Sequence, residues 1–88
     1  MAVYNIFQRQ SVDKDFRKIG SGNLAAIILK IKTLSTNPRP PGCKKLIQSE
    51  NSYRIRVGDY RVIYQIDDQA KSVMICYVRH RQDVYKSR

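Results

Sequence analysis

The chain has 88 residues, the size of a single domain (residues 1–88), and 42% of them are hydrophobic, so it can bury one modest core. Its formal charge is +10, with +6 from residues 1–51 (nine basic, three acidic) and +4 from residues 52–88 (eight basic, four acidic). The hydrophobic content excludes a disordered chain, the spread of the charge excludes a detachable basic tail, and the basic excess favours a polyanionic partner, most often nucleic acid, over a merely soluble basic protein.

Residues 2–8 are the first predicted element, a strand, because Val, Ile, Tyr and Phe dominate them. A first helix follows. Ser11 can cap its start, and the helix dipole favours the acidic Asp13 in its first turn. Gly20 would end this helix as a C′ glycine. Apolar residues at helical spacing give the helix one stripe: Val12, Phe16 and Ile19.

A second helix is predicted after the short link at residues 21–23, with Asn23 as its cap. It must stop by Asn37, because Pro38 disfavours helical geometry in the residue before it. So short a link makes the two helices an antiparallel hairpin, whose apolar stripes need a sheet to cover. The stripe of the second helix is Leu24, Ile27, Ile28, Ile31 and Leu34.

Strand patterns fill the second half of the chain after a proline-rich loop. The last apolar run is typical of a strand buried on both faces, with Cys76 in the core. The order β-α-α-β-β-β predicts an α+β fold, with the helical hairpin packed on one face of a small, twisted, antiparallel-dominated sheet. The expected strands after the loop are Tyr53–Val57, Tyr60–Ile66 and Ser72–Val78, with Lys45–Ile47 as a further candidate strand outside this order.

The hairpin formed by two of these strands crowds basic side chains onto one face. Gly58-Asp59 fits a two-residue type II′ turn, which sets Arg56 opposite Arg61. Because side chains alternate along a strand, Arg54 shares that face. Like charges directly opposite one another destabilise a sheet, so the pattern favours an anion site over a merely solvated outer face.

The end of the last strand adds further polar residues. Arg79 and Arg81 keep the parity of Tyr77 if the strand continues. His80 points the other way, and Tyr85 follows within a short turn. Arginine presents a planar fork of donors that suits phosphate, so a basic surface with tyrosine nearby fits an RNA-binding or RNA-cleaving face.

Neither membrane insertion nor metal chemistry is expected. The longest apolar run, Leu24–Leu29, is far shorter than a membrane span, and residues 1–20 lack the apolar core of a signal peptide. One histidine and two distant cysteines do not make a zinc site, and no carboxylate cluster falls near the arginines, so no metal or cofactor is predicted. The cysteines favour a reduced, cytoplasmic protein.

The stretch "YRIRVGDYRVIYQID", the apolar strand after it and "RHRQDVY" resemble the RelE/ParE toxin superfamily, and its RelE branch in particular. The resemblance covers nearly the whole chain, since the order of the elements also matches. Toxins of the RelE type belong to type II toxin–antitoxin pairs, enter the ribosomal A site and cleave mRNA there without metal. The resemblance implies a ribosome-dependent endoribonuclease, an mRNA interferase that inhibits translation and forms a hetero-oligomer with a cognate acidic antitoxin.

The resemblance also implies roles for single residues. Arg61 is expected to hold the phosphate at the transition state. Which group takes the 2′-hydroxyl proton stays open, because many relatives have lysine where this chain has Arg54 or Arg56. Tyr85 is the first candidate for proton transfer and His80 the second. The residues matched to the family's catalytic set are Arg54, Arg56, Arg61, Arg79 and Tyr85.

Lys44, Lys45 and Arg81 are expected to add contacts to the RNA. Two other functions stay open. A ParE-type inhibitor of DNA gyrase would share the fold without being a nuclease, although such members usually lack the full basic set with the terminal tyrosine. A non-catalytic RNA-binding module would bind RNA with steep salt dependence and cleave nothing.

Overall fold

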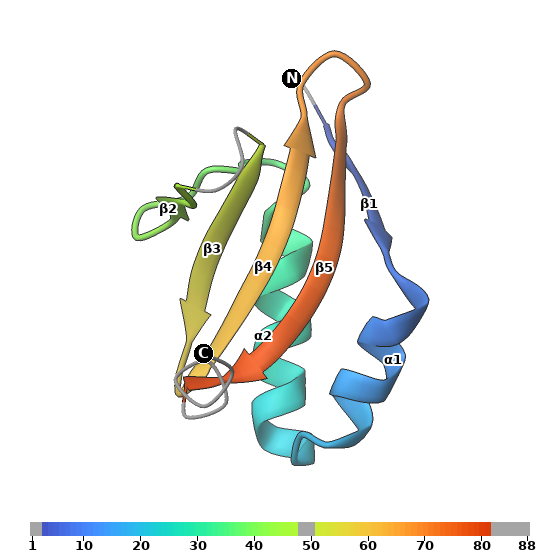
Figure 1. Ribbon diagram of the computed structural model, residues 1–88, viewed down its shortest axis with the longest axis vertical. Coiled ribbons are helices and arrows are strands. Elements are labelled where there is room, and N and C mark those ends of the chain that lie inside the picture. The colour runs from blue at the N-terminus through green and yellow to red at the C-terminus, as the bar shows by residue number, and fades with distance from the viewer. Residues whose placement is uncertain (1–2, 48–50, 82–88) are drawn as a thin grey trace.

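The structure, a computed structural model, describes residues 3–47 and 51–81 (Figure 1). The order of its elements is the predicted one, and the candidate strand ahead of the hairpin is present as the short strand β2. The elements are β1 (Asn5–Gln8), α1 (Gln10–Arg17), α2 (Ser21–Thr33), β2 (Lys44–Lys45), β3 (Ser52–Val57), β4 (Tyr60–Asp67) and β5 (Ser72–His80).

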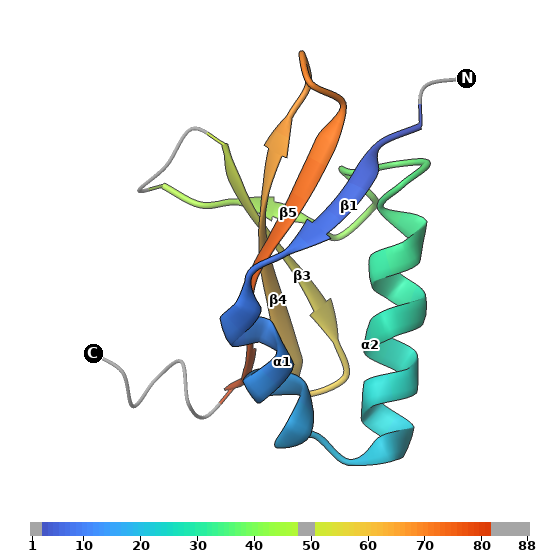
Figure 2. The same cartoon turned by 90° about the vertical axis from the view of Figure 1, so that its right-hand side faces the viewer.

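The strands form one sheet in the order β1-β5-β4-β3-β2. β1 pairs with β5 in parallel, and the other neighbouring pairs are antiparallel. Figure 1 looks onto the face of the sheet that the helices leave open, with α2 behind the strands, and Figure 2 shows α2 standing on one side of the sheet. The predicted α+β fold, with helices on one face of an antiparallel-dominated sheet, is confirmed.

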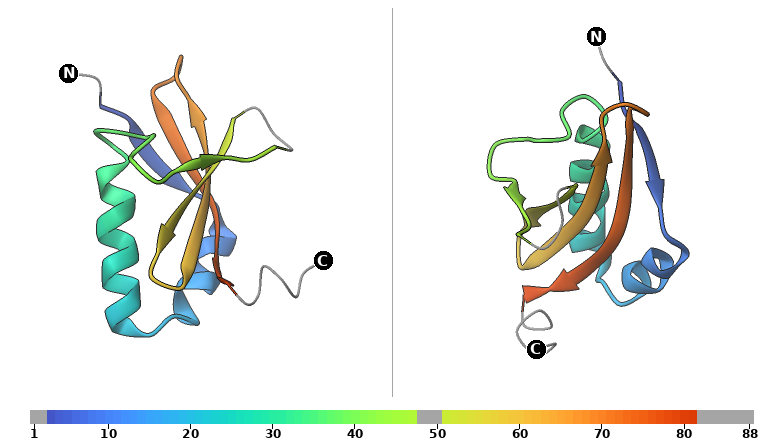
Figure 3. Two further views of the ribbon diagram at one scale, coloured as in Figure 1. Left: turned by 90° about the vertical axis from the view of Figure 1, so that its left-hand side faces the viewer. Right: turned by 45° about the horizontal axis from the view of Figure 1, so that its top comes forward.

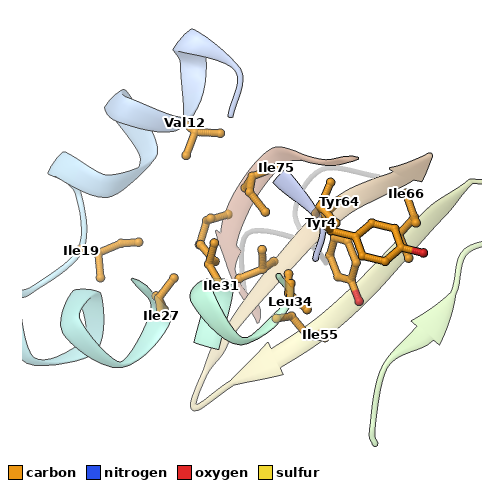
Figure 4. Packing of buried hydrophobic residues seen from close by; sticks show 13 residues of the cluster. Tyr4, Val12, Ile19, Ile27, Ile31, Leu34, Ile55, Tyr64, Ile66 and Ile75 are labelled. Carbon is orange, nitrogen blue, oxygen red and sulfur yellow. The ribbon is translucent and has the colours of Figure 1, made fainter. Parts of the chain in front are cut away.

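A single apolar core lies between the helices and the covered face of the sheet (Figure 4). Val12 of α1 and Ile27 of α2 are fully buried there, as the helical stripes predicted. They meet Ile55, Val62 and Ile75 from the three long strands, all almost fully buried. The opposite face of these strands therefore carries the side chains that alternate with the core residues.

The predicted helix ends were wrong by one to three residues. α1 begins at Gln10 with Arg9 at the N-cap, so Ser11 lies inside the helix. Gly20 is not a C′ glycine: it is the N-cap of α2, with φ −61° and ψ 149°, and Asn23 lies in the first turn of that helix. Cap preferences are worth only about 1 kcal/mol each, less than the burial that fixes the positions of the helices.

The strands agree with prediction except at their edges. Gly58 has φ 60°, and the predicted pairing of the hairpin, including Arg56 with Arg61, is confirmed. β2 covers Lys44–Lys45 and not the expected Lys45–Ile47. The prediction that the last strand is buried on both faces was wrong, since Tyr77 is 38% exposed, because the helices cover one face only. Cys76 is buried, as expected.

Arg39 of the proline-rich loop ties this loop to the turn between β4 and β5. Its guanidinium donates to both carboxylate oxygens of Asp68, at 3.2 and 2.9 Å, and its Nε donates to the hydroxyl of Tyr53 at 3.2 Å. The hydroxyl of Tyr4 donates to Asp68 at 2.6 Å. Figure 3 (left) looks onto the β2–β3 edge that this loop leads into. These contacts hold the loop that leads into β2 against β3 and against the turn between β4 and β5.

Candidate functional site

Three arginines form one row across the open face of the sheet. Arg61 of β4 pairs with Arg56 of β3 on one side and with Arg79 of β5 on the other. Neighbouring strands lie roughly 5 Å apart, so three arginine positions stand side by side. The hairpin predicted the first pair, and the register of β5 adds the third arginine. We call Arg56, Arg61 and Arg79 the arginine row.

A β-bulge places Arg79 on this face. Val73 and Ile75 of β5 are core residues, so strict alternation would send Tyr77 and Arg79 into the core as well. The register between β4 and β5 shifts at Ile63/Tyr64, where Cys76 is the extra residue on β5. Beyond the bulge Val78 is the core residue, and Tyr77 and Arg79 lie on the open face.

Arg79 is held in place by a carboxylate of α1. Its Nη1 lies 2.7 Å from Oδ1 of Asp15, whose side chain is only 11% exposed. The Oδ2 of the same carboxylate accepts the backbone N–H of Val78 at 3.0 Å. β1 pairs with β5 only as far as Ile75, so Asp15 binds the edge of β5 where that pairing has ended. The guanidinium of Arg79 also lies over the Tyr77 ring, 5.0 Å from its centroid.

The row next to the arginines mixes basic and apolar side chains. Arg54 of β3 pairs with Lys44 of β2 on one side and with Ile63 of β4 on the other. Ile63 in turn pairs with Tyr77. Arg61 is half-buried, and its Nε is shielded from water. The three positions predicted on the hairpin, Arg54, Arg56 and Arg61, therefore share one face.

The row of Arg54, Ile63 and Tyr77 lies in a groove of ≈ 440 Å³, which we call the Tyr77 groove. Its apolar lining is Leu46, Ile47, Ile63 and Tyr77. Its basic lining is Lys44, Lys45, Arg54 and Arg61. Both lysines predicted to contact RNA thus lie on the same surface as Arg54 and Arg61, and Arg61 belongs to the groove and to the arginine row alike.

Two predicted site residues belong neither to the arginine row nor to the lining of the Tyr77 groove. His80 pairs with Tyr60 and meets its ring edge-on, with 5.2 Å between centroids; it lines a separate cavity of ≈ 290 Å³ beside Lys18. Arg81 turns to the β3–β4 turn, where its Nε lies 3.8 Å from Oδ1 of Asp59. Tyr85 lies outside the described residues.

Within residues 3–47 and 51–81, no cluster of three or more His, Cys, Asp or Glu side chains could hold a metal ion. Neither helix in this part of the chain is long and apolar enough to cross a bilayer.

Sequence reasoning missed two residues of this site. Asp15 appears in the sequence as an ordinary acidic residue of an amphipathic helix, and nothing local links it to a strand more than sixty positions later. Tyr77 appears as one more apolar residue of a buried strand. A signal for it does exist, because an aromatic residue two positions before Arg79 shares the face of that arginine.

A family model described as the ParE toxin of the type II toxin–antitoxin system parDE matches residues 6–85. A protein of Methanocaldococcus jannaschii that carries the name RelE1 is 31% identical over 87 residues, which is 96% of this chain and 97% of that protein.

Two solved structures are similar over nearly the whole chain. The archaeal RelE–RelB complex from Pyrococcus horikoshii superposes with a TM-score of 0.80 at 26% identity, covering 92% of this chain and 97% of the other. The toxin–antitoxin complex RelBE2 from Mycobacterium tuberculosis gives a TM-score of 0.79 at 30% identity, covering 91% and 93%.

Proposed function

This chain belongs to the RelE/ParE superfamily of type II toxins, and from that premise we propose that it is a ribosome-dependent mRNA endoribonuclease that inhibits translation in the cytoplasm. On this proposal the 2′-hydroxyl of one nucleotide attacks the adjacent phosphate. The bond to the 5′-oxygen of the next nucleotide breaks, and a 2′,3′-cyclic phosphate remains. The reaction needs a base, an acid and stabilisation of a doubly charged phosphorane, and it needs no metal ion.

The arginine row supports this mechanism. A phosphate over Arg61 lies within reach of Arg56 and Arg79 on the neighbouring strands. Arginine stays protonated near neutral pH, so these side chains stabilise charge and do not act as bases. Because the donors are already assembled on a sheet, little reorganisation is needed when charge develops on the phosphate.

Proton transfer falls to other groups. Tyr85 is the first candidate, because it matches the terminal tyrosine of RelE-type toxins in sequence. His80 is the second candidate. It pairs with Tyr60, so its side chain lies on the opposite face of the sheet from the arginine row. Arg54, Lys44 and Lys45 would bind the RNA backbone beside the scissile phosphate. Arg81, which contacts Asp59, would bind the RNA backbone near the turn between β3 and β4.

Primer extension on a reporter mRNA in a cell-free translation reaction tests the proposal. Wild type, Arg61→Ala and Arg17→Ala would be compared with and without ribosomes. The Arg17 variant is the matched control, because it removes an exposed arginine from α1 and leaves the sheet intact. New 3′ ends within translated codons are expected for wild type and the control, only with ribosomes, and not for Arg61→Ala. Intact mRNA in every lane would refute the nuclease.

Inhibition of DNA gyrase is the second candidate, because the matching family model is that of the ParE toxin. A gyrase inhibitor would leave mRNA intact and block supercoiling of relaxed plasmid by purified gyrase. The two functions therefore separate in parallel assays. Cleavage of mRNA without any effect on supercoiling is the expected result.

An antitoxin is the expected partner of this chain, as in the M. tuberculosis complex. The formal charge of +10 and the basic open face favour an acidic, partly disordered protein that wraps the toxin and covers the arginine row. Coexpression with the neighbouring small reading frame should restore growth of cells that express the toxin. Failure with every adjacent reading frame would count against the toxin assignment.

A further inference from the structure

We propose that the Tyr77 groove binds one nucleobase of the RNA, stacked on the Tyr77 ring, and thereby reads the nucleotide next to the scissile phosphate. The inference rests on the proposed RNA-cleaving function and adds a base-reading site to it. Tyr77 is then a specificity-determining residue and not a catalytic one.

The lining of the groove requires a ligand with two different parts. Leu46, Ile47 and Ile63 present apolar surface, and Ile47 is fully exposed. Phosphate binding alone gives no reason for apolar side chains in the middle of a basic face. A flat apolar group fits this surface, and a nucleobase is such a group.

The other part of the ligand must be anionic. Lys44 and Lys45 line the groove on the β2 side, and Arg54 and Arg61 line it on the floor of the sheet. Four cations around an apolar patch suit a base with phosphates on either side of it. A volume of ≈ 440 Å³ lies in the range of pockets that bury small ligands, roughly 300–1,000 Å³.

The Tyr77 ring is held by a contact with Arg79. The guanidinium of Arg79 lies over the ring at 5.0 Å from the centroid, and the ring also lines the groove. On this proposal the base stacks on the ring face that Arg79 leaves open. Arg79 is itself fixed by the carboxylate of Asp15 at 2.7 Å. The chain of contacts from Asp15 through Arg79 to Tyr77 preorganises the aromatic surface, which reduces the entropy lost when a base binds.

The position of the groove identifies the nucleotide. Arg61 is the middle member of the arginine row and also lines the groove. A phosphate held by the row therefore has its neighbouring nucleotide over Ile63 and Tyr77, which pair with each other directly beside Arg61. The base read in this groove is thus adjacent to the bond that is cut.

Binding of short RNAs with 2′-O-methyl riboses, which cannot be cleaved, tests the inference. One base at a time is removed to give a series of abasic RNAs. Affinity is measured by fluorescence anisotropy, on free RNA and on RNA displayed in the decoding site of purified ribosomes. The proteins are wild type, Tyr77→Ala, Tyr77→Phe and Phe7→Ala. Phe7→Ala removes another exposed aromatic ring, on β1 at the opposite edge of the sheet, and is the matched control.

For wild type, removal of one particular base should weaken binding roughly 10-fold, since stacking on an aromatic side chain is worth that much or more per base. Tyr77→Ala should bind the intact RNA as weakly as wild type binds that abasic RNA, with no further loss when the base is removed. Tyr77→Phe and Phe7→Ala should behave as wild type. An antitoxin side chain is the other occupant to exclude.

Affinity that is independent of every base, or equal in Tyr77→Ala and wild type, would overturn the inference. Lack of binding both to free RNA and to RNA displayed on ribosomes would overturn it as well. Loss of antitoxin binding alone in Tyr77→Ala would assign the groove to that protein and would also overturn it. Because the readout is binding, base-dependent affinity without any cleavage would refute the nuclease and leave the groove as a base site.

Discussion

Asp15 and Arg79 form the contact that joins the helical layer to the basic face. One carboxylate oxygen of Asp15 binds the guanidinium of Arg79 at 2.7 Å, and the other accepts the N–H of Val78 at 3.0 Å. The helix therefore fixes both the backbone and the side chain at the end of β5. The side chain of Arg79 remains 40% exposed despite this contact, so it stays accessible to a phosphate.

Replacing Asp15 by Asn should destabilise the protein by about 1 kcal/mol, because a charge-assisted bond to a half-exposed arginine is lost. Urea unfolding would measure the change. Asp13→Asn is the control on the same helix: its carboxylate accepts a hydrogen bond from the neutral side chain of Gln8, so a smaller change is expected. Equal effects of the two substitutions would show that Asp15 gives no special support to β5.

Arg56→Gln should raise the free energy of unfolding by a few tenths to about 1 kcal/mol, because it relieves the repulsion from Arg61 directly opposite. The same change should slow mRNA cleavage, because one cation of the arginine row is lost. Arg17→Gln, which lowers the net charge equally, should change neither. A destabilised Arg56→Gln protein would mean that the facing arginines do not repel each other in the folded chain.

The bond between Arg39 and Asp68 should shape unfolding in acid. The guanidinium of Arg39, and then the hydroxyl of Tyr4, lower the pKa of Asp68 from its ordinary value of 3.8 to about 2. A lowered pKa means that the stabilising contribution is complete above the unfolded-state pKa near 4 and is lost as the pH falls toward 2. Asp68→Asn should therefore flatten the dependence of stability on pH between 4 and 2, measured by urea titration. An unchanged slope would contradict the contact.

The two cysteines should react at different rates with a thiol reagent. Cys43 is half-buried, whereas Cys76 is buried at the bulge of β5, and burial raises the pKa of the Cys76 thiol. Thiolate is the reactive form, so Cys43 should be modified first and Cys76 only through transient opening. Cys43→Ala should remove the fast phase of modification, as monitored by mass spectrometry. A fast phase that survives in Cys43→Ala would place Cys76 at the surface.

The hairpin could be predicted in detail because its rules are local. The Gly58-Asp59 turn and the two-residue period of a strand are enough to set Arg56 opposite Arg61 and to put Arg54 on the same face. The helical stripes were predictable for the same reason. The helix ends were not, because the weak preferences of Ser11 and Asn23 for capping positions yielded to packing.

The complete arginine row required the structure. Arg79 joins it only through the pairing of β4 with β5 and through the bulge at Cys76, which reverses the side-chain alternation and leaves no trace in the sequence pattern. The parallel pairing of β1 with β5 and the contact of Asp15 with β5 connect distant parts of the chain. Such long-range contacts follow from the packing of the whole domain and not from any local preference.

Single-turnover cleavage on purified ribosomes programmed with one mRNA tests the central claim most directly, namely that the arginine row stabilises the phosphorane. Wild type, Arg61→Ala and Arg17→Ala would be used at saturating concentration, with ribosome binding measured in parallel. Arg61→Ala should cleave roughly 100- to 1,000-fold more slowly, as when one donor is removed from an oxyanion site, while it still binds the ribosome. Arg17→Ala should cleave at the wild-type rate. Cleavage by Arg61→Ala within a factor of about two of wild type would contradict the claim.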